Sequence, residues 1–79
     1  MADRFLQLSE VAEILNISSS QTYALVRSGE LPAIKIGGRG QWRVERSRLE
    51  AYIERLYAET EAFVAAHPFA REQSGAEED

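Results

Sequence analysis

The sequence predicts a mainly α-helical fold with one small β-hairpin, in the order helix, helix, hairpin, long helix. Apolar residues recur at helical spacing on both sides of a short break at residues 16–18. They then alternate in two short runs around the glycine-rich stretch "KIGGRGQW", and return to helical spacing up to about residue 66. With 79 residues and no cysteine, the chain has the size of one small domain without disulfides.

The first predicted helix covers residues 9–15. Val11, Ala12 and Leu15 fall on one helical face, and Ser9 precedes them as a candidate N-cap. Asn16 tolerates the left-handed backbone conformation, so we expect the helix to end there.

The second predicted helix covers residues 19–28. Ser18 and Gln21 have the spacing of a capping box, and Gly29 is a suitable residue just after a helix. Because so few residues separate the two helices, we expect them to pack at a steep angle, as in a helix-turn-helix.

The predicted hairpin pairs Ala33–Ile36 with Gln41–Val44 around a turn that Gly37, Gly38 and Gly40 make sterically easy. We expect Lys35 and Arg43 to point outward and Arg39 to occupy the tip. The apolar side chains of the hairpin are expected to face the core: Ile34, Ile36, Trp42 and Val44. This is the layout of a DNA-contacting wing, although a solvated cationic face is the alternative.

The third predicted helix starts at Ser47, with Glu50 completing a capping box, and continues to about Ala66. Its apolar stripe extends past Leu56, beyond the length that a small domain needs to cover itself. We therefore expect residues 1–57 to form the domain, residues 58–68 to form a helical extension that serves self-association, and residues 69–79 to form a disordered acidic tail. Folding of the extension back onto the first helix is the alternative.

The net charge of −4 conceals an asymmetry, because residues 33–48 alone carry +4 whereas residues 49–79 carry −6. A local basic patch is what a phosphate backbone senses at short range, since salt screens more distant charges. An acidic chain of this kind is therefore compatible with DNA binding through its hairpin.

Catalytic chemistry finds no support in the sequence. The single histidine, His67, precedes a proline and suggests a solvated surface residue, and "GGRG" lacks the Gly-Lys-Ser/Thr ending of a P-loop. We expect no catalytic residue, metal, cofactor, small-molecule ligand or membrane segment, and a cytoplasmic location at the bacterial or phage nucleoid.

The second helix offers short polar side chains at its N-terminus, where a helix entering the major groove reaches bases and phosphates. Gln21 either reads adenine or only caps the helix, and the sequence leaves both open. Tyr23 and Arg27 are better placed for phosphates, while an extended Arg39 suits the narrow minor groove.

Residues 5–53 closely resemble the excisionase-type helix-turn-helix domains of the MerR superfamily. The resemblance rests on "LSEVAEIL", "YALVRSGELPAIKIGGR" and "WRVERSRLEAYI". It implies a winged helix-turn-helix that binds duplex DNA, as a transcriptional regulator or recombination directionality factor, as a homodimer or a head-to-tail array. Ala24 departs from the pattern, because many relatives are cationic there. The DNA-contacting positions that the resemblance implies are Ser19, Ser20, Gln21, Tyr23, Arg27, Lys35, Arg39 and Arg43.

A different class of function also fits the fold. A protein-interaction adaptor would keep the helix-turn-helix but bind a protein, and the acidic C-terminal part together with the weakly cationic second helix motivates this alternative.

Overall fold

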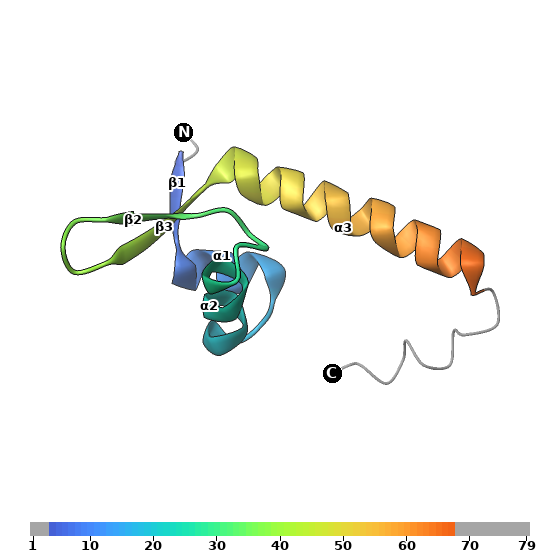
Figure 1. The fold of residues 1–79 in the computed structure, drawn as a ribbon, viewed down its shortest axis with the longest axis horizontal. Helices are drawn as coiled ribbons and strands as arrows, with labels where there is room; N and C mark the ends of the chain where they lie inside the picture. The colour runs from blue at the N-terminus through green and yellow to red at the C-terminus, as the bar shows by residue number, and fades with distance from the viewer. Residues whose placement is uncertain (1–3, 68–79) are drawn as a thin grey trace.

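The computed structural model describes residues 4–67, which form three helices and a three-stranded sheet (Figure 1). The order along the chain is β1 (Phe5–Gln7), α1 (Leu8–Leu15), α2 (Ser19–Arg27), β2 (Ile34–Ile36), β3 (Gln41–Glu45) and α3 (Arg46–Ala66). The predicted fold class, mainly α with a hairpin wing, is confirmed. The acidic segment 69–79 lies outside the described residues.

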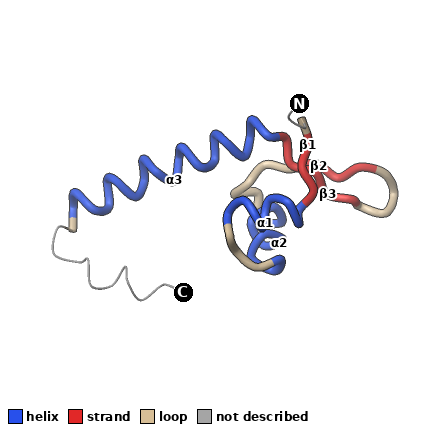
Figure 2. The backbone as a smooth tube through the Cα atoms, turned by 180° about the vertical axis from the view of Figure 1, so that it is seen from behind, coloured by secondary structure: helices blue, strands red, loops and turns tan. Residues whose placement is uncertain are grey.

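The sheet contains one strand that the sequence did not reveal. Its order is β1-β3-β2, with both pairs antiparallel. Figure 2 shows the three strands in red, on the side of α1 and α2 from which the hairpin loop projects. β1 pairs Leu6 with Val44, so the N-terminal strand joins the side of β3 that β2 leaves open. Three residues are too few to display a clear alternation, which is why this strand escapes a periodicity argument.

The predicted orientation of the wing side chains was wrong for Ile34, Lys35 and Ile36, whereas Trp42 and Val44 face the core as expected. Lys35 pairs with Trp42, whereas Ile34 pairs with Arg43, and directly opposite residues point to the same face of an antiparallel sheet. The face with Trp42 and Val44 packs toward the helices, so Lys35 lies on that side. Ile34 is 47% exposed on the other face, because the predicted pairing of residues 33–36 with 41–44, which the structure has, itself places Ile34 opposite Arg43.

Helix α1 begins one residue earlier than predicted, and Ser9 is not its cap. The chain passes directly from β1 into the helix at Leu8, so Gln7 takes the N-cap position. The carboxylate of Glu10 accepts a hydrogen bond of 2.8 Å from the Gln7 backbone N–H. At the other end, Asn16 is left-handed with φ of 56°, which confirms the predicted stop.

Helix α3 begins at Arg46, not Ser47. Pairing with β1 keeps the strand extended up to Glu45, and the Arg46 N–H donates to the Arg4 carbonyl oxygen at 2.7 Å. The helix therefore starts directly after the strand, and Ser47 lies inside its first turn. Its end at Ala66 agrees with the prediction.

The core lies where the sheet meets α1, α2 and the first half of α3. Val44, Val11 and Leu31 are completely buried. Thr22 is also buried, and its Oγ1 donates to the Ser18 carbonyl oxygen at 2.9 Å, so no buried hydroxyl is left without a partner at this position. The remaining members of the apolar core are Leu6, Val26, Leu49 and Tyr52.

The first half of α3 is fixed to the domain, whereas its second half projects away from it (Figure 1). Arg55 Nη2 donates to the Glu30 carbonyl oxygen at 3.2 Å, and its Cζ lies 5.3 Å from the centroid of the Tyr52 ring. Every residue from Tyr57 to His67 is exposed, so the described part of the extension does not fold back on α1, which was the alternative to self-association.

Candidate nucleic-acid interface

The first turn of α2 is organised by its cap. The Gln21 backbone N–H donates to Ser18 Oγ at 3.1 Å, and the Ser18 N–H donates to Gln21 Oε1 at 3.2 Å. In this structure, then, Gln21 acts as a capping residue. Ser19 and Ser20 are exposed in the same turn, where backbone N–H groups and the helix dipole favour an anion.

Further along α2, the exposed side carries a paired tyrosine and arginine. Arg27 Nη1 donates to Tyr23 Oη at 3.1 Å, and Arg27 Cζ lies 5.6 Å from the Tyr23 ring centroid. Thr22 and Val26 turn to the core instead. The helix thus presents a tethered guanidinium in its last turn, about two turns beyond its polar N-terminus.

Aromatic contacts connect α2 to the wing. The Tyr23 and Trp42 rings have centroids 6.4 Å apart and meet at 85°, an edge-to-face geometry that aromatic pairs prefer. Lys35 Nζ lies 5.6 Å from the centroid of Trp42. Arg27, Tyr23, Trp42 and Lys35 therefore form one continuous series of contacts, called here the aromatic bridge.

The wing tip is a four-residue turn in which the Gly40 N–H donates to the Gly37 carbonyl oxygen at 3.2 Å. Gly37 and Gly40 have φ of 75° and 70°, values that side chains disfavour. A Cβ on Gly40 would lie 2.7 Å from Lys35 Cε, so the glycine also makes room for the lysine chain. Arg39 is exposed within this turn.

Arg43 does not join the other predicted contacts. It neighbours Trp42 along β3 and therefore points to the opposite face of the sheet, the face of Ile34. Arg43 Nη1 donates to the Trp42 carbonyl oxygen at 2.7 Å.

Of the eight residues predicted from the sequence, Tyr23, Arg27 and Lys35 belong to the aromatic bridge, and Arg39 lies at the wing tip. Ser19 and Ser20 precede Tyr23 by four and three residues and so share its side of α2. Gln21 lies on another side of the helix, where it lines a hollow with Leu25 and Tyr52.

The charges on this surface are uncompensated. Within residues 4–67, ion pairs join Arg4 to Glu45 and Arg55 to Glu59, away from this surface. Arg27, Lys35 and Arg39 therefore have no carboxylate partner in the described part of the chain, and their charge is available to a phosphate backbone.

Other chemistries have little support in this part of the chain. The described residues contain no cluster of histidine, cysteine or carboxylate side chains that could hold a metal ion. None of the helices among them is both long enough and apolar enough to cross a membrane. His67 Nδ1 lies 2.9 Å from the Phe63 carbonyl oxygen, so this histidine packs on its own helix.

Sequence comparison places the chain in a family. Residues 5–57 match the family described as helix-turn-helix domain, which spans all described elements up to the middle of α3. The chain belongs to the helix-turn-helix domain family. DNA binding is therefore the class of function that the fold and the family support together.

One relative of this chain has a name that indicates a function. The chain is 37% identical over 57 residues to a protein from Saccharopolyspora erythraea named "Probable excisionase". The match covers 72% of this chain but only 56% of that relative, so the two differ in extent. The expected resemblance to excisionase-type helix-turn-helix domains is confirmed by these matches. No solved structure gave a significant match.

Sequence reasoning missed the bridge between α2 and the wing. Trp42 was expected in the core, and it does pack against the core while partly exposed. The signal that could have revealed its second contact is the presence of Tyr23 on the exposed side of a short helix. A large aromatic ring at such a position often has a partner on a neighbouring element.

Proposed function

We propose that this protein binds specific sequences of duplex DNA, with α2 in the major groove and the wing against the adjacent backbone. The observation that carries the proposal is the aromatic bridge. It holds the exposed side of α2 and Lys35 of the wing on one side of the molecule, and the cations there have no carboxylate partners.

Each side chain on this surface has a proposed role. Ser19 and Ser20 approach bases or phosphates at the helix N-terminus. Arg27 and Lys35 contact phosphates, with Tyr23 supporting the arginine. Arg39 at the wing tip enters the minor groove, where negative potential is strongest when the groove is narrow.

The Gln21 side chain can bind adenine only if it releases the Ser18 backbone N–H that it caps. Its Oε1 accepts from the Ser18 N–H in the free protein, so bidentate contact with a base requires that hydrogen bond to break. Arg43, on the opposite face of the sheet, stays a prediction from the sequence that the geometry supports least.

The biological role that fits best is that of an excisionase-like accessory factor in recombination, or of a small transcriptional regulator. The name of the curated relative supports the first of these. A winged helix-turn-helix without a second domain in the described residues can serve either role, because both require sequence-specific binding and no catalysis.

Self-association through α3 is part of the proposal. Leu15, Ile53, Leu56, Tyr57 and Thr60 line an apolar hollow of about 270 Å³ where α3 leaves the domain. Phe63 and Val64, 53% and 57% exposed, continue the same stripe. A second copy could cover it, as the sequence predicted. Sedimentation of the full chain beside Phe63→Gln tests this, since equal masses at all concentrations would exclude pairing through α3.

The DNA-binding proposal is tested by two matched arginine variants. Arg39→Ala removes a charge at the wing tip, whereas Arg48→Ala removes an exposed charge from the start of α3. We expect Arg39→Ala to weaken binding and to lower the salt slope by about one contact, with Arg48→Ala near wild type. Equal losses would mean that only net charge matters, and an unchanged Arg39→Ala would reject the wing contact.

The alternative function, a protein-interaction adaptor, is favoured by the exposed apolar stripe of α3. Affinity purification from nuclease-treated extract distinguishes it. A partner retained without DNA would support the adaptor, whereas loss of all partners after nuclease treatment would support DNA binding.

A further inference from the structure

The sheet face opposite the aromatic bridge carries an apolar surface that nothing in the described chain covers. Phe5, Ile34 and Ile36 are 38%, 47% and 48% exposed. In the sheet, Phe5 lies opposite Glu45, Ile34 opposite Arg43 and Ile36 opposite Gln41. Because every second residue of β3 points to the same side, these side chains share one face of the sheet. This surface is called the outer face below.

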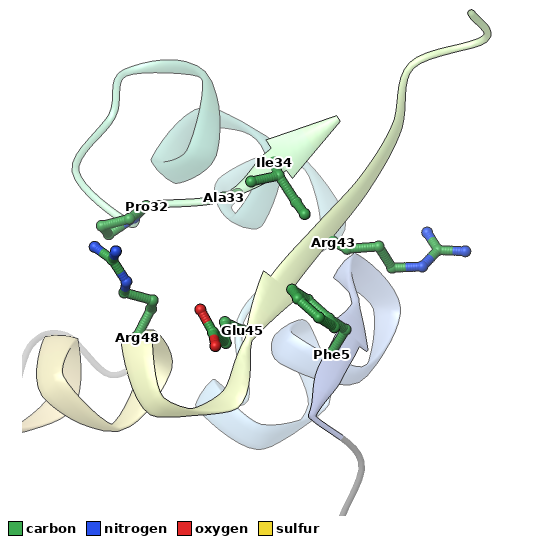
Figure 3. A pocket seen from close by; sticks show the side chains of 7 residues that line it. All are labelled: Phe5, Pro32, Ala33, Ile34, Arg43, Glu45 and Arg48. Atoms are coloured by element: carbon green, nitrogen blue, oxygen red, sulfur yellow. The ribbon is translucent and has the colours of Figure 1, made fainter. Parts of the chain in front are cut away.

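A cleft opens on the outer face, with a volume of about 250 Å³ (Figure 3). A cavity of about 150 Å³ is enough to hold benzene, so the cleft has room for one bulky side chain. Its apolar wall consists of Phe5, Pro32, Ala33 and Ile34, and its polar rim consists of Arg43, Glu45 and Arg48.

The rim of the cleft has an excess of positive charge. Glu45 is already engaged, because its Oε2 lies 3.0 Å from Arg4 Nε, and Arg4 Cζ in turn lies 5.4 Å from the centroid of Phe5. Within residues 4–67, neither Arg43 nor Arg48 is ion-paired. In Figure 3, Arg48 extends toward Pro32 and Arg43 extends outward past Phe5. Two guanidinium groups are therefore available on either side of an apolar hollow.

We infer that the outer face binds a partner protein through a segment in which carboxylates flank a bulky apolar side chain. The apolar side chain fills the cleft, and the carboxylates pair with Arg43 and Arg48 as charge-assisted hydrogen bonds, which arginine favours for its planar fork. An apolar anchor inside a charged rim is the usual composition of a protein-binding hot spot.

The inference is compatible with the proposed DNA surface but independent of it. Lys35 and Trp42 point to one face of the wing, and Ile34 and Arg43 point to the other. A partner on the outer face therefore leaves the aromatic bridge free, so that DNA and partner can be bound at once. Such an arrangement would place a second protein beside the DNA site without competing for it.

Two variants separate the apolar and the charged contributions while keeping the strand intact. Ile34→Thr replaces one exposed apolar side chain of the wall with a smaller polar one but retains a β-branched residue. The double variant Arg43→Gln with Arg48→Gln keeps length and polarity but removes both charges. Thermal unfolding of each full-length variant provides the check that the fold is retained.

The probe is a library of random peptides displayed on phage, selected on the immobilised full chain. We expect enriched peptides that carry Asp or Glu on both sides of Phe, Trp or Leu. A selected peptide should bind each variant at least about tenfold more weakly than the wild type. Absence of enrichment, enrichment of basic peptides, or unchanged affinity for folded variants would overturn the inference.

Other occupants of the cleft give different results. If Arg43 and Arg48 contact phosphates instead, the double variant lowers the salt slope of DNA binding by about two contacts, and the selected peptide competes with duplex DNA. If a second copy occupies the cleft, the double variant lowers the sedimenting mass of the protein alone. Either outcome would contradict a partner segment, whereas simultaneous binding of peptide and random-sequence duplex would support it.

Discussion

The rings of Tyr23 and Trp42 meet at 85° with their centroids 6.4 Å apart, and this contact joins the second helix to the wing. Both rings also hold a cation, Arg27 on the helix and Lys35 on β2. Two elements proposed to contact different parts of a duplex are thus in direct contact through one aromatic pair, in addition to the core that they share. Trp42 is the single tryptophan of the chain, so its fluorescence reports on this contact directly.

The aromatic pair should contribute to stability beyond the burial of each ring. We expect a coupling of about 0.5–1.5 kcal/mol from a double-mutant cycle of Tyr23→Leu and Trp42→Leu. Urea unfolding followed by circular dichroism measures it without relying on tryptophan. The matched control is a cycle of Tyr57→Leu with Trp42→Leu. Tyr57 is 64% exposed, and we expect no coupling between these two positions. Equal coupling in the two cycles would contradict a specific contact.

The turn of the wing should require glycine at one position but not at its neighbour. Gly40→Ala places a Cβ at φ of 70° and 2.7 Å from Lys35 Cε, whereas nothing lies within 4 Å of a Cβ on Gly38. We expect Gly40→Ala to cost about 1–2 kcal/mol and Gly38→Ala to be near neutral. Thermal unfolding compares them, and similar midpoints would show that the tip relaxes freely.

The free energy of unfolding should decline at alkaline pH because the Tyr52 hydroxyl has a raised pKa in the folded chain. Burial, followed by the nearby Glu30 carboxylate, raises the pKa of this hydroxyl above its ordinary value of 10.0. The unfolded chain then loses the proton at lower pH than the folded chain does, so the free energy of unfolding falls as pH rises above about 10. Urea midpoints between about pH 8 and pH 11 measure this fall.

The control for the alkaline effect is a pair of phenylalanine variants. Tyr52→Phe should flatten the decline, whereas Tyr57→Phe, at an exposed position, should leave it as in the wild type. A decline of the same size in Tyr52→Phe would assign the effect to other groups.

The helices could be predicted from the sequence because their signals are local. Val11, Ala12 and Leu15 determine the face of α1, Asn16 determines its end, and the cap of α2 by Ser18 follows from spacing alone. These features depend on contacts within a few residues. The helical part of the fold class followed from them, whereas the family resemblance rested on the stretches "LSEVAEIL", "YALVRSGELPAIKIGGR" and "WRVERSRLEAYI".

The pairing of the two hairpin strands was predicted from the sequence, but the faces of their side chains were assigned wrongly. Antiparallel pairing of residues 33–36 with 41–44 places Lys35 opposite Trp42 and Ile34 opposite Arg43, as in the structure. The faces were instead assigned by hydrophobicity, which grouped Arg43 with Lys35. The outer face and the contact between Tyr23 and Trp42 join residues that are far apart in the chain, so no local pattern indicates them.

The most direct test of the central claim is selection of duplexes from a random library by the purified full chain, at about 0.15 M salt with competitor DNA. The account predicts enrichment of a shared motif by the wild type, and loss or marked weakening of that enrichment for Lys35→Gln combined with Arg39→Ala. Repeated half-sites would also give the geometry of any pairing through α3. Absence of a motif, or an identical motif at equal strength with the variant, would contradict DNA recognition by α2 and the wing.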